Sequence, residues 1–167
     1  MKILIFSDSH SALSFMRRCV AAVKPDQMIH LGDHYDDGSA LSEEFPHLPI
    51  HQVPGNCDRY RCPPGVLETI CYDVGGVRLF MTHGHRQNVK YGIGRLVAEA
   101  HALQAQAALY GHTHVAYCEK DETGMWVINP GSAGYGGGSA ALLTTEKNTI
   151  LSCRILRQED LEEMTGV

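Results

Sequence analysis

The sequence predicts an α/β protein built from two packed β-sheets flanked by helices. Three observations indicate this fold class: an N-terminal third in which short apolar runs alternate with an amphipathic segment, a strand-rich C-terminal half with one helical segment, and the lack of a repeat or linker. With 167 residues, of which 44% are hydrophobic, the chain is long enough for a sizeable core. We therefore expect a single domain over residues 1–167.

The N-terminal third predicts a β-α-β unit. Apolar runs at residues 2–6 and 27–31 indicate two parallel strands, and residues 11–23 between them place apolar side chains at helical spacing. A third strand is expected at residues 49–53, after a short helix near 39–45. Residues 55–65 contain two adjacent prolines, which predict a loop.

The second half predicts a run of strands interrupted by one helix. Gly75 and Gly76 lie between apolar runs at 67–74 and 77–83, a pattern typical of a β-hairpin. An amphipathic helix is expected over residues 92–104. Further strands are expected at residues 107–110, 114–119, 125–129, 140–145 and 149–156. The tail, residues 157–167, predicts a short polar helix or a frayed end.

Composition excludes several classes of protein. The net charge of −5 and the absence of a Lys/Arg block argue against stable binding of long nucleic acids, whereas a small phosphorylated substrate is compatible. No apolar stretch approaches the roughly 18 residues of a membrane span, and the first residues lack a signal-peptide cleavage site. The six cysteines form no C-x-x-C pair, so we expect reduced thiols in a cytoplasmic protein with no membrane segment.

Residue types that bind metals follow the expected ends of five strands. The seven candidate ligands are Asp8, His10, Asp33, Asn56, His83, His112 and His114. In open α/β sheets the carboxyl ends of the strands share one edge, so these segments are expected to converge there. Asp8 and His10 are two residues apart and, in an extended segment, would point to the same side. Gly32, Gly55, Gly84 and Gly111 beside these residues are expected to let the backbone turn tightly.

Seven ligands of mixed oxygen and nitrogen character are too many for one tetrahedral site and suit two metal ions. Carboxylates and imidazoles without thiolates favour Mn, Fe or Zn over Ca. Two ions about 3.5 to 4 Å apart are a common device for in-line attack on phosphorus. A carboxylate can bridge two ions, and we give this role to Asp33. Its neighbours His34, Asp36 and Asp37 are then expected to support the site or form a loop, although the stretch alone would suit a solvated turn.

The ordered motifs "DSH", "GD", "GN", a single His and "GHTH" resemble those of the calcineurin-like metallophosphoesterases, from residue 2 to about residue 156. "GNCD", "THGHRQNVKYGIGRL" and "NPGS" are similar to the compact YfcE-type phosphodiesterases in particular. The resemblance implies a four-layer α/β/β/α sandwich of two mixed sheets flanked by helices. It also implies two divalent metal ions, commonly Mn with Fe, Zn or Ni as alternatives, and a homodimer or homotetramer.

The resemblance further implies a role for each candidate residue. Asp8, His10 and His114 would hold one ion, Asn56, His83 and His112 the other, and Asp33 would bridge them. The implied reaction is hydrolysis of a small phosphodiester by a hydroxide bridging the two ions. Asp33, Asn56 and His85 are the expected catalytic residues, with His85 or a metal-bound water supplying the proton to the leaving oxygen.

Two departures from the family pattern limit what the resemblance implies about activity and substrate contacts. Cys57 stands where many larger members have His, and the loop after "GD" lacks their Arg, so the chain is unlike a protein Ser/Thr phosphatase. The residues after "NPGS" lack the Pro and Arg that relatives tend to show there. Two alternatives stay open: a non-catalytic protein-binding scaffold on the same fold, as in the retromer coat, and a phosphomonoesterase or nuclease. All seven ligand positions are filled, which favours an enzyme.

The remaining polar residues have plainer interpretations. His30 lies within an apolar strand and is expected to be a satisfied core residue. Cys57 is expected to be an inert packed thiol, and Asp58 to hydrogen-bond a neighbouring ligand. His47, His51 and His101 are expected at the surface or in packing, and His85 either positions substrate or supports His83.

Overall fold

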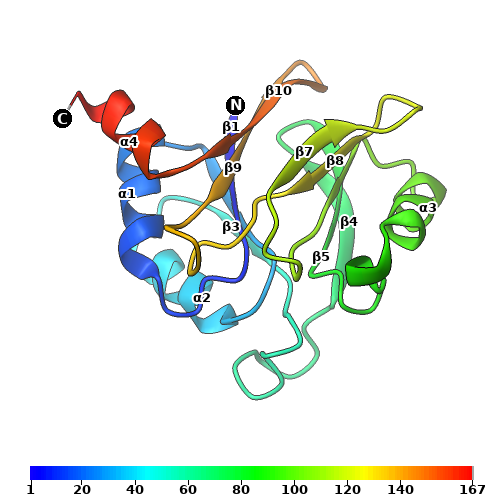
Figure 1. Ribbon diagram of the computed structural model, residues 1–167, viewed down its shortest axis with the longest axis horizontal. Coiled ribbons are helices and arrows are strands. Elements are labelled where there is room, and N and C mark those ends of the chain that lie inside the picture. Colours follow the sequence, from blue (N-terminus) through cyan, green and yellow to red (C-terminus); the bar gives the residue numbers. More distant parts are fainter. Residues whose placement is uncertain (167) are drawn as a thin grey trace.

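The computed structural model describes residues 1–166 and shows a four-layer α/β/β/α sandwich (Figure 1). The first sheet contains β1 (Lys2–Phe6), β2 (Gln27–His30), β3 (Ile50–Gln52), β9 (Ala140–Glu146) and β10 (Thr149–Leu156). Its strand order is β10-β9-β1-β2-β3, in which β1, β2 and β3 are parallel and β9 runs antiparallel to its neighbours. The helices α1 (Leu13–Val23), α2 (Tyr35–Glu44) and α4 (Gln158–Thr165) lie on its outer side (Figure 1).

The second sheet contains β4 (Thr69–Val74), β5 (Val77–Thr82), β6 (Ala107–Leu109), β7 (Tyr117–Lys120) and β8 (Trp126–Asn129). Its strand order is β4-β5-β6-β8-β7, with β5, β6 and β8 parallel to one another. The short 3₁₀ helix η1 (Val89–Tyr91) and the helix α3 (Gly94–Ala102) belong to its outer layer. The predicted fold class, two mixed sheets flanked by helices, is therefore confirmed.

Alternate residues of the strands supply the separate cores of the sandwich. In β1, Ile5 packs in the cluster between the two sheets, whereas Phe6 packs in the cluster beneath α1. In β5, Leu79 belongs to the inter-sheet core, whereas Phe80 packs beneath α3, beside Leu96. Successive side chains of a strand point to opposite faces, so a strand covered on both faces has to be apolar throughout. The continuous apolar runs in the sequence have this cause.

The predicted elements are found, and two of them start at clearly different residues than expected. The expected helix near 39–45 begins earlier, at Tyr35, so Asp36 and Asp37 form its first turn, where negative charge is favourable. The strand expected at 114–119 begins at Tyr117, because His114 has a left-handed φ of 60° that a strand cannot contain. The tail is helical over Gln158–Thr165, and the last residue of the predicted tail lies outside the described residues.

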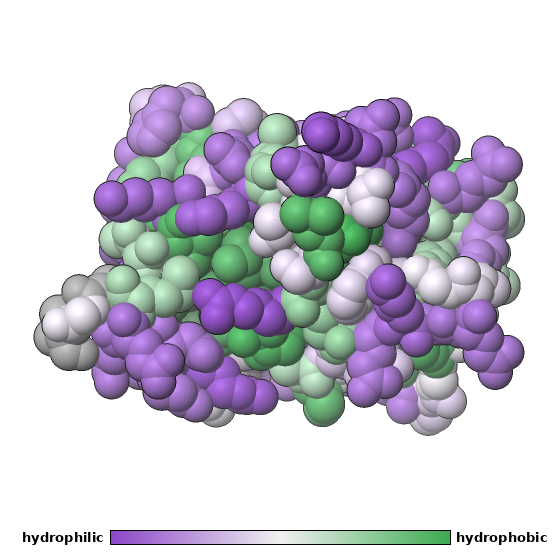
Figure 2. Space-filling model, turned by 90° about the horizontal axis from the view of Figure 1, so that it is seen from above, coloured by the Kyte–Doolittle hydropathy of each residue, from purple (hydrophilic) through white to green (hydrophobic). Residues whose placement is uncertain are grey.

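The parallel strands end at one edge of the sandwich, the lower edge in Figure 1, away from the labelled N-terminus. Figure 2 looks onto the opposite edge, where hydrophobic areas are interrupted by hydrophilic side chains. Among the described residues, no helix combines the length and apolarity that crossing a membrane would require. The loops that follow the strands at the lower edge carry the candidate site.

Candidate metal centre

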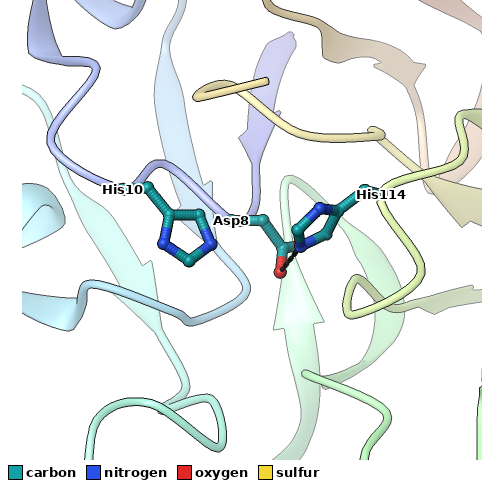
Figure 3. A group of neighbouring side chains, drawn as sticks. All are labelled: Asp8, His10 and His114. Carbon is teal, nitrogen blue, oxygen red and sulfur yellow. Dashed lines mark ion pairs between the residues drawn. The ribbon is translucent and has the colours of Figure 1, made fainter. Parts of the chain in front are cut away.

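The seven predicted ligands converge on one cluster at this edge. Two sets of three predicted ligands have ligand atoms within 4.8 Å of one another: Asp8, His10 and His114 (Figure 3), and Asp8, Asp33 and His83. A third such set, His34, Asp36 and Asp37, contains none of the predicted ligands. Asn56 Oδ1 lies 3.1 Å from His83 Nε2. The His112 ring meets the His83 ring edge-on, with 5.0 Å between centroids. Loops that follow five different strands therefore contribute to the same cluster.

The backbone at the cluster is left-handed at most of these residues. The φ values are 52° at Asp8, 43° at His10, 55° at Asp33, 67° at His112 and 60° at His114. The expectation that Asp8 and His10 belong to an extended segment is therefore wrong. Their side chains converge because the backbone at both residues is left-handed, a conformation that L-residues avoid unless the surroundings fix it.

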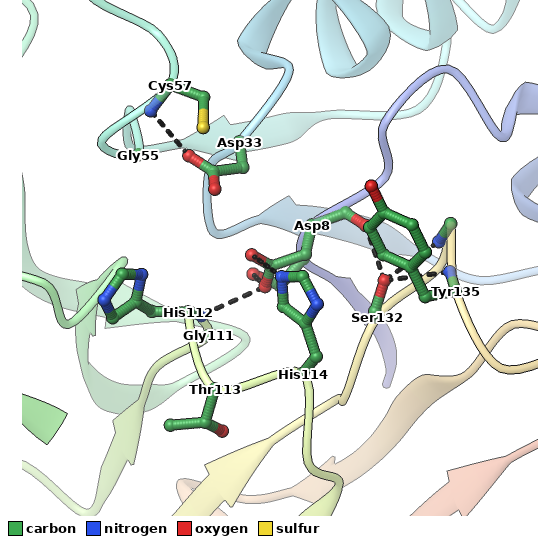
Figure 4. Close-up of polar contacts among 12 residues, drawn as sticks. Asp8, Asp33, Gly55, Cys57, Gly111, His112, Thr113, His114, Ser132 and Tyr135 are labelled. Atoms are coloured by element: carbon green, nitrogen blue, oxygen red, sulfur yellow. Dashed lines mark hydrogen bonds and ion pairs between the residues drawn. The ribbon is translucent and has the colours of Figure 1, made fainter. Parts of the chain in front are cut away.

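Asp8 is fully buried and has one oxygen tied to the protein. Its Oδ2 accepts hydrogen bonds from Ser7 Oγ at 2.6 Å and from the His112 amide at 3.0 Å. Its Oδ1 lies 3.1 Å from His114 Nε2 but forms no hydrogen bond with any described residue. The side chain is thus held by one oxygen and presents the other to the imidazoles (Figures 3 and 4).

Asp33 and His83 form a second buried arrangement beside Asp8. Asp33 Oδ1 accepts a hydrogen bond from the Cys57 amide at 2.9 Å, and Oδ2 lies 3.5 Å from His83 Nε2. His83 Nδ1 donates to Leu31 O at 2.8 Å, which directs Nε2 toward the carboxylates. Burial opposes ionisation of Asp33, yet His83 and the Cys57 amide together hold the pKa of Asp33 well below its usual range. Burial also opposes the charge on His83, but Asp33 and Asp8 raise its pKa.

The donor set fits divalent cations. Asp8 and Asp33 are buried carboxylates whose ion-pair partners within residues 1–166 are all imidazoles. Buried charge requires a counter-charge, and His10 Nε2 is a buried polar atom with no hydrogen-bond partner in the described chain. With Nδ1 of His83 donating, Nε2 lies 3.1 Å from Asn56 Oδ1, an acceptor, so Nε2 has to carry a proton or a metal ion. A cation resolves each of these features, and carboxylate, amide and imidazole ligands suit Mn, Fe or Zn.

The pKa values of the outer imidazoles favour the neutral form that binds metals. Burial, followed by the charge of His34, lowers the pKa of His10. Burial and the charge of His83 lower the pKa of His112 to about 4. The same two causes lower the pKa of His85. A nitrogen that binds a metal ion must be deprotonated, so at neutral pH the rings of His10 and His112 can bind a metal ion without first losing a proton.

The carboxylate common to the two sets of predicted ligands is Asp8. Asp33 belongs to one of these sets, with Asp8 and His83. The bridging role expected for Asp33 remains a prediction. Asn56 and His112, expected to accompany His83, both lie next to its ring.

Two further carboxylates hold the loops around the cluster. Asp37 Oδ2 accepts hydrogen bonds from Ser9 Oγ and from the Ser11 amide, both at 2.7 Å. Asp58 accepts from the amides of His34, Tyr35 and Gly55, at 2.8, 2.9 and 2.7 Å. Asp58 is expected to hydrogen-bond a neighbouring ligand, and its hydrogen bonds come from backbone amides beside Asp33 and Asn56.

Two glycines at the cluster are required for room rather than for a turn. A Cβ on Gly55 would lie 2.2 Å from Asp33 Oδ1, and a Cβ on Gly111 would lie 1.9 Å from Ser7 Oγ. Neither glycine has a positive φ. The expected tight turns are found instead at Gly32 and Gly84, whose φ values are 95° and 102°.

The segment 129–138, whose role the sequence left open, supports the cluster from one side (Figure 4). Asn129 Nδ2 donates to Gly111 O at 3.1 Å, and Ser132 Oγ donates to Asp8 O at 2.7 Å. The Tyr135 ring stacks on the His114 ring, with centroids 5.2 Å apart and planes inclined by 16°. Tyr135 is a member of the site that sequence reasoning missed. The one available signal was a lone aromatic residue within a glycine-rich loop.

Cys57 does not match its prediction as a packed thiol. Its side chain is exposed and its Sγ accepts a weak hydrogen bond from Asn56 Nδ2 at 3.4 Å. Partial burial and the neighbouring Asp33 carboxylate raise the pKa of Cys57, which keeps the sulfur a thiol. All six cysteines are free, in agreement with the expected reduced state.

His30 is a satisfied core residue, as expected, and its side chain connects to Asp37. The Gly32 amide donates to His30 Nδ1 at 3.3 Å, so the proton is on Nε2, which donates to Ser9 Oγ at 3.0 Å. Ser9 in turn donates to Asp37. Burial lowers the pKa of His30 to about 4 from an ordinary value of 6.5.

His30 should therefore make the protein less stable in mild acid. Below pH 6.5 His30 is protonated in the unfolded chain but stays neutral in the folded chain. Its contribution to the free energy of unfolding is therefore complete above pH 6.5 and is lost as the pH falls toward 4. By pH 5 the loss should reach about 2 kcal/mol. Urea unfolding of metal-stripped protein at pH 7.5 and pH 5 measures this loss. The free energy of unfolding of His30→Gln should differ less between the two pH values than that of the unsubstituted protein. An equal difference in both proteins would contradict the prediction.

Comparisons with known proteins agree with this geometry. The family model described as "Calcineurin-like phosphoesterase superfamily domain" matches residues 1–148. The chain is 34% identical over 137 residues to the probable metallophosphoesterase YsnB of Bacillus subtilis, across 79% of this chain and 75% of that protein. A predicted phosphoesterase from Streptococcus pneumoniae superposes with a TM-score of 0.75 at 25% identity, over 95% of this chain and 90% of the other. YfcE, a phosphoesterase from E. coli, shares the fold with a TM-score of 0.63 at 20% identity, over 92% and 98% of the two chains.

Proposed function

The chain belongs to the calcineurin-like phosphoesterase superfamily, and from this premise we propose that it is a metal-dependent phosphodiesterase that hydrolyses a small phosphodiester. The observation that carries the proposal is the cluster itself: two buried carboxylates, Asp8 and Asp33, surrounded by imidazoles at the carboxyl ends of parallel strands. We further propose that two divalent ions bind there, most readily Mn, and that the protein works in the cytoplasm.

The chain's own residues would hold and orient these ions. Asp8, His10 and His114 would hold one ion, His83, Asn56 and His112 would hold the other, and Asp33 would serve both. When bound, the pair of divalent ions supplies Lewis acidity that activates water near neutral pH and offsets charge on the phosphoryl oxygens. The protein fixes the donor atoms in advance through the Leu31 carbonyl on His83, the Cys57 amide on Asp33 and the His112 amide on Asp8.

His85 is the residue to which we assign delivery of a proton to the leaving oxygen. Its ring centroid lies 5.5 Å from that of His83 and 6.2 Å from that of His112, so it borders the cluster without joining any of the three-residue sets. Its Nδ1 is buried with no hydrogen-bond partner among the described residues, which leaves the atom free for a substrate or a water. To Asn56, which is exposed at the same border, we assign contact with a phosphoryl oxygen.

The proposal is tested by hydrolysis of bis(p-nitrophenyl) phosphate and p-nitrophenyl phosphate. Metal-stripped protein is refilled with Mn, Zn, Ni or Mg, and Asp33→Asn is the comparison variant. We expect the diester to be the better substrate and turnover to require metal. Asp33→Asn should lose more than about 100-fold in kcat/KM, because substitution of residues that only hydrogen-bond metal ligands already lowers metal affinity or activity by about 10- to 100-fold. His85→Ala should lose more on an ester with a poor leaving group than on a p-nitrophenyl ester.

The other outcomes identify the alternatives. Faster hydrolysis of the monoester would favour a phosphomonoesterase. A folded protein that binds metal, as shown by a shift in its melting temperature, yet hydrolyses neither compound would favour the protein-binding scaffold.

A further inference from the structure

A cavity of about 710 Å³ opens directly beside the candidate metal centre. Its inner end is lined by Asn56 and His85, the two residues that border the cluster. Its outer wall comes from the loop after β3, residues 54–68, which projects from the lower edge of the sandwich (Figure 1). Cavities of this size suit a small organic molecule.

The charged groups in the cavity wall leave one cation without a partner. Arg86 donates from Nε and Nη2 to both oxygens of Glu68, at 2.7 and 3.0 Å, so each neutralises the other. Both oxygens of Asp58, the other acid in the wall, accept hydrogen bonds from backbone amides. Arg59 forms no ion pair within the described chain, and its guanidinium lies over the Tyr60 ring, 5.4 Å from the ring centroid.

The remaining wall is apolar. Pro63, Pro64 and Val66 line the cavity, and adjacent prolines restrict the backbone of the loop that carries them. The cavity therefore combines an apolar surface, an unpaired cation and an inner end at the reacting centre.

The geometry points to this cavity as the site for the leaving group of the substrate, with Arg59 pairing with a second anionic group on that leaving group. The substrate class is then a phosphodiester whose leaving alcohol has an apolar body and carries a carboxylate or phosphate. Arg59 acts as a specificity-determining residue. This inference rests on the proposed phosphodiesterase function, because it assigns a place to one product of that reaction.

Two diesters that differ in a single anionic group test the inference. Methyl 4-nitrophenyl phosphate and its 3-carboxy derivative both release a nitrophenolate, since methanol is the far poorer leaving group. The Mn-loaded protein should prefer the carboxylated ester by about 2- to 5-fold in kcat/KM, through KM, as expected for a partly exposed charge pair. Higher salt should weaken the preference.

Substitutions of two arginines in the same loop separate specific from general charge effects. Arg59→Ala should abolish the preference and Arg59→Lys should keep part of it. Arg61→Ala removes the same charge two residues away, from a side chain paired with Asp36 at 2.8 Å, and should keep the preference. A preference absent from the unsubstituted protein, or unchanged in Arg59→Ala, would overturn the inference.

A binding measurement decides the matter if neither ester is hydrolysed. Failure to hydrolyse both would count against the proposed phosphodiesterase function, whereas the cavity can be tested with the free leaving alcohols. Ligand-observed NMR should detect 5-hydroxy-2-nitrobenzoate bound more tightly than 4-nitrophenol, and Arg59→Ala should remove the difference. Equal binding of the two compounds to the unsubstituted protein would refute the charge pairing.

Discussion

Asp8→Asn is expected to lower phosphoesterase turnover by more than about 100-fold and to remove the stabilisation of the protein by divalent metal ions. Asp8 is the carboxylate common to the two three-residue sets of predicted ligands, so the substitution removes a negative charge from the centre of the cluster. Substitution of residues that only hydrogen-bond metal ligands costs about 10- to 100-fold in metal affinity or activity, and loss of a charged ligand should cost more. Measurements of kcat/KM and of melting temperature with and without Mn check both effects.

The fold should survive this substitution. The Asn side chain keeps an oxygen that can accept from Ser7 Oγ and the His112 amide, and it removes one of two neighbouring buried negative charges. The matched control is Asp73→Asn, since Asp73 is an exposed carboxylate that pairs with Arg78 and belongs to none of the three-residue sets. The control should retain both turnover and the metal-dependent rise in melting temperature. If Asp8→Asn also retained that rise, Asp8 would not be a ligand.

Gly111→Ala should lower the free energy of unfolding by about 1 to 3 kcal/mol and reduce turnover by more than about 10-fold. The added Cβ would lie 1.9 Å from Ser7 Oγ and 2.8 Å from Asp8 Oδ2, in a fully buried environment. Either the Ser7 side chain or the loop carrying His112 has to move, and both hydrogen-bond Asp8. Chemical denaturation and steady-state kinetics measure the two effects.

Gly94→Ala provides the control for this glycine. Gly94 opens α3, has no positive φ, and an added Cβ would meet no atom within 4 Å, so the change should not lower stability. Combining Gly111→Ala with Ser7→Ala removes the hydroxyl that causes the clash and should recover part of the lost stability. Wild-type stability of Gly111→Ala would show that the packing around Ser7 is looser than the structure indicates.

Much of the fold could be predicted because local sequence and tertiary packing agree. β1 is apolar from Ile3 to Phe6 because both faces of this part of the strand are buried, and Gly75 and Gly76 close the hairpin in which Val74 pairs with Val77. The start of α2 could not be predicted in this way. Tyr35, Asp36 and Asp37 have ordinary turn propensities, and tertiary bonds from Asp58 to the His34 and Tyr35 amides fix where the helix begins.

The membership of the site was easier to predict than its arrangement. Ligand-type residues placed after strand ends indicated the cluster, because parallel strands share an edge. Tyr135 was not predicted, since its contacts with His114 and His10 come from residues distant along the chain. The left-handed backbone at Asp8 and His10 was also missed, because neither residue type requires it.

The left-handed residues around the candidate metal centre lower the stability of the protein. Seven of the twelve described non-glycine residues with positive φ belong to the loops of this centre: Asp8, His10, Ser11, Asp33, His34, His112 and His114. Such a conformation costs about 1 to 2 kcal/mol for a residue with a Cβ, and glycine would avoid much of it. Glycine cannot bind a metal, so the chain gives up stability at the positions where it needs carboxylates and imidazoles. Selection of this protein for thermal stability alone should therefore favour replacements in these loops first, and its most stable descendants should be its least active.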